Sequence, residues 1–465
     1  MRIGIIVAAS AAAFIAISTP RALAAQGAPS GGAARAVPAA ARAWWHDITV
    51  LADDSLRGRA TGSSDYLTAA RYVESEFRKA GLAPIGGDAN DPYFQTVHLE
   101  TVRLVPDRSG VALVSGGTID TLALDKDVFI DVSTTTPAHV DAPMVFVGYG
   151  LHFPGTRDDL GNTSVRGKIA VYLNRLPSGL SATVMAHTRS GRWDALRAAG
   201  AVGAIAITEP PAPGSRAARF GIRGRSVVTG LADDPAGGGV MLVMPDSTAT
   251  FSVERLFVGS GHRYAELRAM ADRDSAAILP TFALTPTFSV WTELTRTPLE
   301  APNVLGVLRG SDPGLRNQYV IVSAHLDHLG VGRPVNGDSI YNGAMDNASG
   351  IATMLEVARA FHAQHIRPKR SLIFAAVTAE EKGELGSAYY ATHPTVPVHD
   401  IVADLNTDMW EPLIPLRGVF GYGAHQSDLG NDLAAALAAH GLTLMEDPHP
   451  EQVRFIRSDQ YSFIK

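Results

Sequence analysis

The chain has 465 residues, of which 46% are hydrophobic and 18% are charged, so it is long enough to bury a substantial core. The formal net charge of −6, with no block of Lys and Arg, excludes the positive field that attracts nucleic acid or anionic lipid. Because there is no cysteine, disulfides, thiolate metal ligands and cysteine nucleophiles are excluded as well. Any bound metal ion must therefore be held by His, Asp and Glu.

The N-terminus has the features of an export signal. Arg2 precedes a mostly apolar stretch at residues 3–17, and the sequence Ala22-Leu23-Ala24 suits a signal peptidase. A membrane span is the alternative, but the apolar run is shorter than the ~20 residues that a bilayer requires. We therefore predict a signal peptide at 1–24, cleavage near Ala24, a periplasmic or secreted protein, and no stable membrane insertion.

A flexible leader and an amphipathic helix are predicted next. Residues 25–41 are rich in Ala, Gly and Pro, a composition that does not favour an ordered structure. The segment 51–63, LADDSLRGRATGS, mixes charged residues with Gly and could contribute to a cleft, but it is interpreted as a solvated loop and receives no role. A serine cap at Ser64 and a stop at Gly81 then delimit a helix. Its apolar face consists of Tyr66, Ala69, Ala70, Val73 and Phe77.

Residues 142–290 are predicted to form an inserted β-rich domain. Strand-like runs such as PMVFVGYG and GKIAVYLN alternate with turns rich in Gly, Pro and Asp, and SGRWDALRAAG supplies one helix. No catalytic constellation is expected in this region. It would separate an N-terminal part of the main domain, 42–141, from the remainder, 291–465.

The last part of the chain alternates strand and helix patterns, which predicts an α/β fold with a mixed, mainly parallel sheet flanked by helices. Apolar runs at 319–324, 371–378 and 401–406 have the composition of buried parallel strands. Acidic or imidazole clusters follow each of them, and such sheets place their ligands beyond the carboxyl ends of the strands. These clusters are AHLDH, TAEEKGE and LNTD, and a fourth, AMDN, lies between the first two.

Each cluster supplies a side chain suited to a two-metal hydrolytic site. His325 and Asp327, two residues apart on a strand end, would point the same way, with Asp327 fixing the tautomer of the histidine. A histidine beside a surface aspartate is the alternative, and the three further clusters weigh against it. His328 is one residue out of phase and is predicted to be structural.

The carboxylates of the other clusters differ in their surroundings. Asp346 precedes a helix that Asn347 or Ser349 can cap, a position that keeps a carboxylate ionised. Glu380 and Glu381 follow an apolar strand, so their side chains diverge: one can bind metal while the other accepts a proton.

The motifs AHLDH, MDNASG, TAEEKGELGS and LNTDM resemble those of the co-catalytic zinc aminopeptidases. The wider family includes glutamate carboxypeptidase, transferrin receptor and the glutaminyl cyclases. The segment LRGRATGS resembles the opening of the peptidase unit, and the β-rich insert resembles a protease-associated domain. The resemblance covers nearly the whole mature chain.

This resemblance implies two zinc ions per chain, bridged by Asp346. His325 and Asp408 would complete one site, Glu381 would serve the other, Glu380 would be the general base, and Asp327 would support His325. The second zinc of the family takes a further histidine that follows a stretch resembling RSDQYSFIK, and we expect it beyond Lys465. His449 precedes that stretch and is not assigned.

The implied activity is hydrolysis of N-terminal residues from peptides by a water molecule that the two metal ions activate. A carboxypeptidase or dipeptidase is an alternative, for which Arg333 or Arg454 would bind the terminal carboxylate. A binding protein with an inactive site is another, although the presence of a general base weighs against it. A cyclase would lack the inserted domain.

Overall fold

The computed structural model describes residues 38–464, apart from 154, 156, 210–226, 233–237 and 411–415. The expected signal peptide at 1–24 and most of the expected leader lie outside the described residues. Helix α1, Ala39–Leu51, includes the last three residues assigned to that leader. The chain forms two compact units, one made of residues up to His98 and from Leu299 onward, the other of Leu99–Pro298.

The first unit is built on a mixed sheet that includes the strand order β2-β14-β18-β15-β19. Strand β1 (Ala83–Pro84) also pairs with β14, and β11 (Val227–Leu231) pairs with the part of β2 that belongs to the second unit. Strand β15 is parallel to both of its neighbours, β18 and β19, whereas β14 is antiparallel to β18. The three strands predicted from the apolar runs are therefore confirmed, and their carboxyl ends lie together. The strands are β2 (Phe94–Leu104), β14 (Leu294–Leu308), β15 (Tyr319–His325), β18 (Ser371–Val377) and β19 (Ile401–Asn406).

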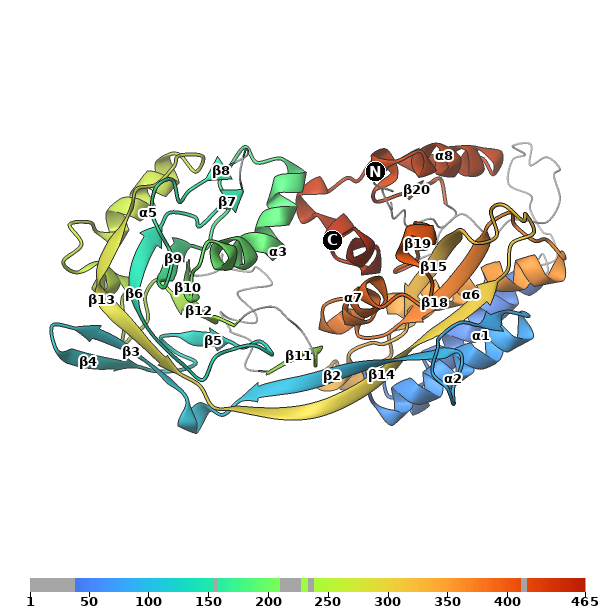
Figure 1. Cartoon of the computed structure of the whole chain (residues 1–465), viewed down its shortest axis with the longest axis horizontal. Helices are drawn as coiled ribbons and strands as arrows, with labels where there is room; N and C mark the ends of the chain where they lie inside the picture. The colour runs from blue at the N-terminus through green and yellow to red at the C-terminus, as the bar shows by residue number, and fades with distance from the viewer. Residues whose placement is uncertain are drawn as a thin grey trace. The chain divides into compact units, whose positions relative to one another are not determined.

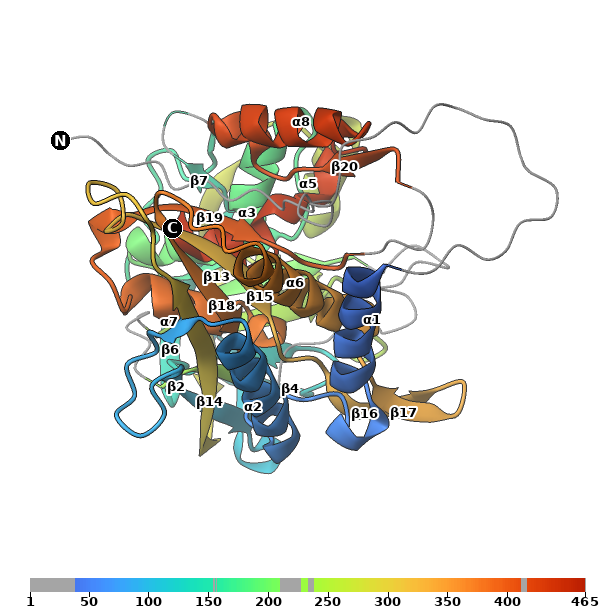
Figure 2. The same ribbon diagram turned by 90° about the vertical axis from the view of Figure 1, so that its right-hand side faces the viewer.

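Helices cover both faces of this sheet, as Figures 1 and 2 show. Alternate residues of a strand point to opposite faces. Ile373 accordingly packs in the cluster of Tyr390 from helix α7, Leu385–Thr392. The ring of Phe374 lies 6.3 Å from that of Phe77 in helix α2, Ser64–Lys79. Helix α6, Ser349–Ala363, lies between α1 and the sheet. This arrangement confirms an α/β fold with a mixed sheet.

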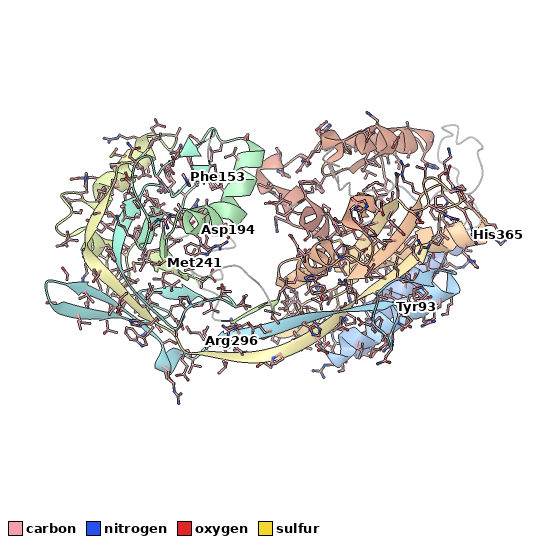
Figure 3. The ribbon with its side chains drawn as sticks, viewed as in Figure 1. Tyr93, Phe153, Asp194, Met241, Arg296 and His365 are labelled. Atoms are coloured by element: carbon pink, nitrogen blue, oxygen red, sulfur yellow. The ribbon has the colours of Figure 1, made fainter. Side chains whose placement is uncertain are left out.

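Helix α2 matches the predicted amphipathic pattern. All five residues of the expected apolar face are buried, and the Ser63 hydroxyl accepts the Tyr66 main-chain N–H at 3.0 Å. The cap is thus one residue earlier than Ser64. Tyr93, labelled in Figure 3, donates its hydroxyl to the carbonyl oxygen of Leu82 and so fixes the segment that follows the helix.

The second unit contains an eight-stranded sheet with the order β4-β3-β13-β6-β9-β10-β12-β5. The strand-like runs predicted from the sequence form four neighbouring strands of this sheet, β6, β9, β10 and β12. Helix α3, Ala182–Ala198, contains the predicted helical segment and begins earlier. The unit is wider than the expected 142–290, because β3, β4 and β5 join the same sheet. The strands are β3 (Gly110–Ser115), β4 (Thr118–Leu122), β5 (Phe129–Asp131), β6 (His139–Val147), β9 (Ile169–Leu173), β10 (Gly203–Thr208), β12 (Val240–Pro245) and β13 (Thr281–Trp291).

The remaining elements are short or peripheral. None of the described helices is both long enough and apolar enough to cross a membrane. These elements are β1 (Ala83–Pro84), β7 (His152–Phe153), β8 (Arg157–Asp158), β11 (Val227–Leu231), α5 (Tyr264–Arg273), β16 (Gly330–Val335), β17 (Asp338–Tyr341), β20 (Gly418–Phe420), α8 (Leu429–Ala439) and β21 (Thr443–Met445).

The contact between Phe374 and α2 should contribute strongly to stability. The side chain is fully buried, so Phe374→Ala is expected to lower the free energy of unfolding by about 3–5 kcal/mol. Trp45, which is 58% exposed, provides the control: Trp45→Ala should change it by about 0.5 kcal/mol or less. Chemical denaturation of both variants checks this, and equal effects would contradict the packing described.

Candidate metal centre

Three neighbouring strand ends bring the predicted ligands together. His325 is the last residue of β15, and Glu380 and Glu381 lie in the short helix η5, Glu380–Lys382, just after β18. Asp408 follows β19 by two residues. Asp346 comes from the turn η4, Ala344–Ala348, that precedes α6. Parallel strands therefore carry side chains from distant parts of the sequence to one edge of the sheet.

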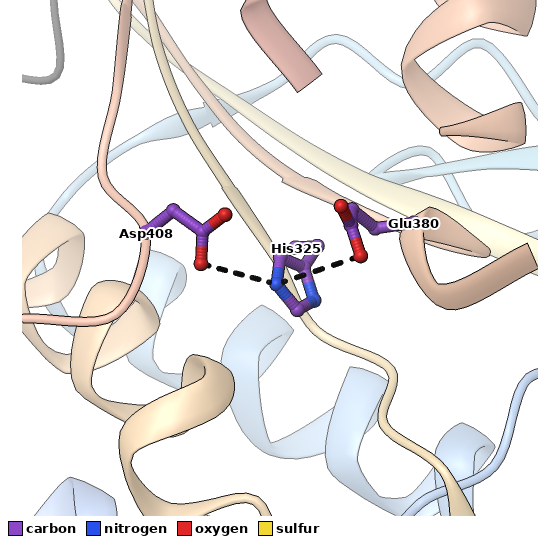
Figure 4. A group of neighbouring side chains, drawn as sticks. All are labelled: His325, Glu380 and Asp408. Carbon is purple, nitrogen blue, oxygen red and sulfur yellow. Dashed lines mark ion pairs between the residues drawn. The ribbon is translucent and has the colours of Figure 1, made fainter. Parts of the chain in front are cut away.

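The first group of side chains surrounds the Nε2 atom of His325. This atom lies 3.2 Å from Oδ1 of Asp346, 3.4 Å from Oδ1 of Asp408 and 3.9 Å from Oε2 of Glu380. Figure 4 shows the imidazole between the carboxylates of Asp408 and Glu380. Ligands held about 2.0–2.2 Å from a tetrahedral ion are separated by about 3.3 Å. The two shorter distances fit a shared ion, and Glu380 stands outside ligand distance.

A second group consists of His328, Asp346 and Glu381, with one candidate ligand atom from each within 4.8 Å of the others. The Nδ1 atom of His328 lies 2.6 Å from Oε1 of Glu381. His328, predicted to be structural from its phase on the strand, thus lies beside Glu381; the phase does not apply to it, because β15 ends at His325. Asp346 thus lies between both groups.

Four buried ligand atoms in these groups have no hydrogen-bond partner among the described residues. They are Nε2 of His325, Oδ1 of Asp408, Nδ1 of His328 and Oε1 of Glu381. Buried polar atoms left unpaired cost free energy, and in native proteins they are nearly always satisfied by a protein group, water or an ion. Two such atoms fall in each group, so the donors present suit two cations.

The electrostatic surroundings also favour a cation. Burial raises the pKa of Glu380; the charge of His325 opposes this, and the carboxylates of Asp459 and Asp408 add to it. Burial alone would lower the pKa of His325, but the neighbouring carboxylates of Asp346 and Asp408 raise it well above its usual value. The centre therefore holds crowded negative charge, which a bound cation would neutralise.

Asp327 supports the site in a different way from that expected. Its main-chain carbonyl oxygen lies 3.1 Å from Nδ1 of His325, while its carboxylate is 4.0 Å from the same nitrogen. The carboxylate instead accepts the Glu380 main-chain N–H at 3.1 Å and the Thr61 hydroxyl at 2.7 Å. The main chain of Asp327 thus orients the histidine, and its side chain fixes the start of η5.

Asn347 joins the turn of Asp346 to the loop of Asp408. Its Oδ1 accepts the main-chain N–H of Gly350 at 3.0 Å, which confirms it as a cap of α6, and that of Met409 at 3.1 Å. Its Nδ2 donates to the carbonyl oxygen of Thr407 at 3.0 Å. The residues on either side of Asp408 are therefore held against the turn that presents Asp346.

Arg59 is the most important residue that the sequence analysis missed. Its side chain is fully buried, and the expectation of a solvated loop at 51–63 is wrong for this residue. Burial lowers the pKa of the guanidinium to about 10, which leaves it charged at neutral pH. The sequence signal was a pair of arginines among glycines, which is also common in exposed loops. The guanidinium donates to the carbonyl oxygens of Leu51, Leu326, Asn342 and Gly343 at 2.5–2.9 Å.

The segment that contains Ser458 and Asp459 also contributes. The Ser458 hydroxyl donates to Oδ2 of Asp408 at 2.6 Å and accepts from Asn406 at 2.8 Å. Asp459 is fully buried, and burial raises the pKa of its carboxyl group. The sequence analysis quoted this stretch, but it gave no role to either residue, because neither follows a strand pattern.

Comparison with known proteins shows which family the region of this centre resembles. Residues 303–465 match the model of peptidase family M28. A probable zinc metalloprotease from Pyrenophora teres f. teres is 35% identical over 114 residues, 24% of this chain and 23% of that protein. Leupeptin-inactivating enzyme 1 of Streptomyces exfoliatus is 33% identical over 23% of this chain and 22% of its own length. The matches thus span about a quarter of these relatives.

Solved structures resemble the chain over a longer stretch. The aminopeptidase from Aneurinibacillus sp. strain AM-1 covers 91% of this chain, and 82% of its own length, with 20% identity and a TM-score of 0.49. BSAP, a zinc aminopeptidase from Bacillus subtilis, covers 92%, and 83% of its own length, with 19% identity and a TM-score of 0.41. The family model itself includes all six side chains of the two groups. Residues 303–465 of this chain are therefore similar to peptidase family M28.

Proposed function

We propose that this protein is an exported, zinc-dependent aminopeptidase that removes N-terminal residues from peptides with two metal ions. The observation that carries the proposal is the pair of ligand groups that meet at Asp346, each with two buried atoms that lack a partner. The names of the relatives, which include zinc proteases and zinc aminopeptidases, support the choice of metal and of reaction.

The donor set suits zinc. Carboxylate and imidazole are common zinc ligands, and two nearby cations require an anion between them. In this proposal Asp346 would be shared by both ions, His325 and Asp408 would hold the first, and Glu381 would hold the second. Bound zinc would supply Lewis acidity and lower the pKa of a coordinated water toward ~7.

Glu380 is the proposed general base. Its Oε2 faces the first group at 3.9 Å from His325, too far to share a tetrahedral ion but close enough to take a proton from a water molecule there. The carboxylate of Asp327 holds the Glu380 main-chain N–H and thereby fixes the direction of the base. After attack on the peptide carbonyl, Glu380 would return the proton to the leaving amine.

The alternatives are less well supported. A carboxypeptidase or dipeptidase needs a cation for the terminal carboxylate, but Arg333 is exposed, and Arg454 donates to Tyr422 and Gln452. A binding protein with an inactive site would have no need for Glu380 beside the metal ligands. Export is supported by the signal sequence predicted at 1–24.

Substrate tests should separate these activities. We expect hydrolysis of leucine p-nitroanilide, loss of hydrolysis when the amine is acetylated, and recovery with zinc after chelation. A free amine has a lone pair that can bind a metal ion, and an acetylated amine does not. The acetylated substrate should therefore not be hydrolysed. Hydrolysis that continues in chelator, or that prefers the blocked substrate or a free carboxyl terminus, would exclude a metal-dependent aminopeptidase.

Glu380→Gln should abolish proton transfer without removing the ligands. We expect kcat to fall by about 10²- to 10⁴-fold while the zinc content is unchanged. Glu446→Gln is the matched control, because the Glu446 side chain is 83% exposed, and it should retain normal activity. If Glu380→Gln were as active as the control, Glu380 would not be the base.

Asp346→Ala should remove the anion that the two ions share. We expect the variant to lose both zinc ions, as measured by elemental analysis after dialysis, because each group loses a ligand. Asp338→Ala, at an exposed aspartate of β17, should bind zinc normally. Circular dichroism establishes that both variants are folded, and a folded Asp346→Ala with two ions would refute the bridging assignment.

A further inference from the structure

The two carboxylate oxygens of Asp408 have different surroundings. Its Oδ1 faces Nε2 of His325 at 3.4 Å, within the first group of ligands, as Figure 4 shows. Its Oδ2 accepts the Ser458 hydroxyl at 2.6 Å, a distance typical of a hydroxyl that is bound to an ionised carboxylate. Because Asp408 lies two residues beyond the end of β19, the strand ladder does not fix its position. Ser458 therefore determines which oxygen faces the first group.

Two buried amide side chains lie behind the Ser458 hydroxyl. The Nδ2 atom of Asn406 donates to Oγ of Ser458 and to Oε1 of Gln460, both at 2.8 Å. The Oδ1 atom of Asn406 lies 3.2 Å from the Ser323 hydroxyl. The Nε2 atom of Gln460 donates to the main-chain carbonyl oxygen of Phe455 at 2.6 Å. Both amide side chains are buried, so these protein groups replace the hydrogen bonds that water would otherwise supply.

The carbonyl oxygen of Phe455 sets the direction of every hydrogen bond in this chain. A carbonyl oxygen can only accept, so the Gln460 amide must turn its Nε2 toward Phe455 and its Oε1 toward Asn406. That Oε1 can also only accept, so Asn406 must present its Nδ2. Ser458 then accepts from Asn406, and its single hydroxyl hydrogen is left for Asp408. The order of donors and acceptors thus aims the Ser458 hydroxyl at one oxygen of Asp408.

We propose that Ser458, Asn406 and Gln460 are positioning residues that aim the Oδ1 atom of Asp408 at the first metal ion. This inference rests on the proposed metallopeptidase function and concerns residues that are not themselves ligands. The terminal torsion of an aspartate is broad, so a hydrogen bond to one oxygen decides the direction of the other. Residues that hold a metal ligand in this way typically change metal affinity by about 10- to 100-fold when they are removed.

Zinc titration by calorimetry on the full chain tests this inference. Ser458→Ala should weaken one zinc site by about 10- to 100-fold. His325→Ala, which removes a proposed ligand, should weaken the same site and so identify it as the first. Ser462→Ala is the matched control and should bind zinc with unchanged affinity. Ser462 is also buried and lies four residues further on, but its hydroxyl pairs with that of Ser387 at 3.0 Å.

A double-mutant cycle distinguishes a connected chain from separate packing effects. Gln460→Leu removes the amide that lies two hydrogen bonds behind Ser458, and it replaces that amide with a side chain of similar size. We expect Gln460→Leu alone to weaken the first site by a smaller factor than Ser458→Ala does. In the Ser458→Ala background it should cause no further loss of zinc affinity, because the chain is already interrupted. Fully additive losses in folded variants would overturn the proposed chain.

The outcomes separate this inference from the proposed function. Normal zinc affinity in a folded Ser458→Ala, or a loss no larger than that of Ser462→Ala, would overturn the positioning role and leave the metallopeptidase proposal intact. Circular dichroism establishes folding. If Ser458→Ala is unfolded, Gln460→Leu decides alone, and an unchanged first site in that variant would overturn the inference. No zinc binding by the unmodified chain would overturn the proposed function itself.

Discussion

The geometry of the metal centre depends on one buried cation, the guanidinium of Arg59. It donates to carbonyl oxygens of three segments: the end of α1, the loop after β15, and two consecutive residues of the turn before Asp346. A buried guanidinium is costly unless its donors are satisfied, so these carbonyl groups must come together when the side chain is buried. The loop that carries Asp327 and the turn that carries Asp346 are fixed by the same group.

The centre concentrates carboxylates that would repel one another without a cation. Asp346, Glu380, Glu381 and Asp408 meet at one edge of the sheet, and the side chain of Asp327 lies beneath them. Arg59 and the two histidines of the polypeptide balance part of this negative charge. Several buried ligand atoms still have no hydrogen-bond partner among the described residues, which indicates that bound ions would balance the rest of the charge. Metal ions bound at this centre would therefore stabilise the first unit, because ions that bind only the folded state stabilise it.

The sequence predicted the parts of the site that follow from local patterns. Three apolar strands, each followed by a ligand, were sufficient to bring His325, Glu380, Glu381 and Asp408 to one edge of a parallel sheet, and Asn347 was identified as a helix cap. The sequence did not predict the features that depend on contacts between residues far apart in the chain. Nothing near Arg59 in the sequence reveals its acceptors, and strand phase does not apply to His328 because the strand had already ended. For Asp327, residue type predicted a supporting role, but only the loop conformation decides between its carbonyl and its carboxylate.

The distance along the chain between Arg59 and its partners has a consequence for the order of folding. Its acceptors at Leu326, Asn342 and Gly343 lie 267, 283 and 284 residues later, whereas the unit Leu99–Pro298 is one continuous stretch. During synthesis, which proceeds from the N-terminus, that intervening unit is complete before any of the three acceptors exists. Arg59 must therefore remain hydrated while the 200 residues of the unit Leu99–Pro298 are synthesised and fold. The first unit forms around an arginine synthesised much earlier, so its assembly carries the loop-closure cost of a long-range contact.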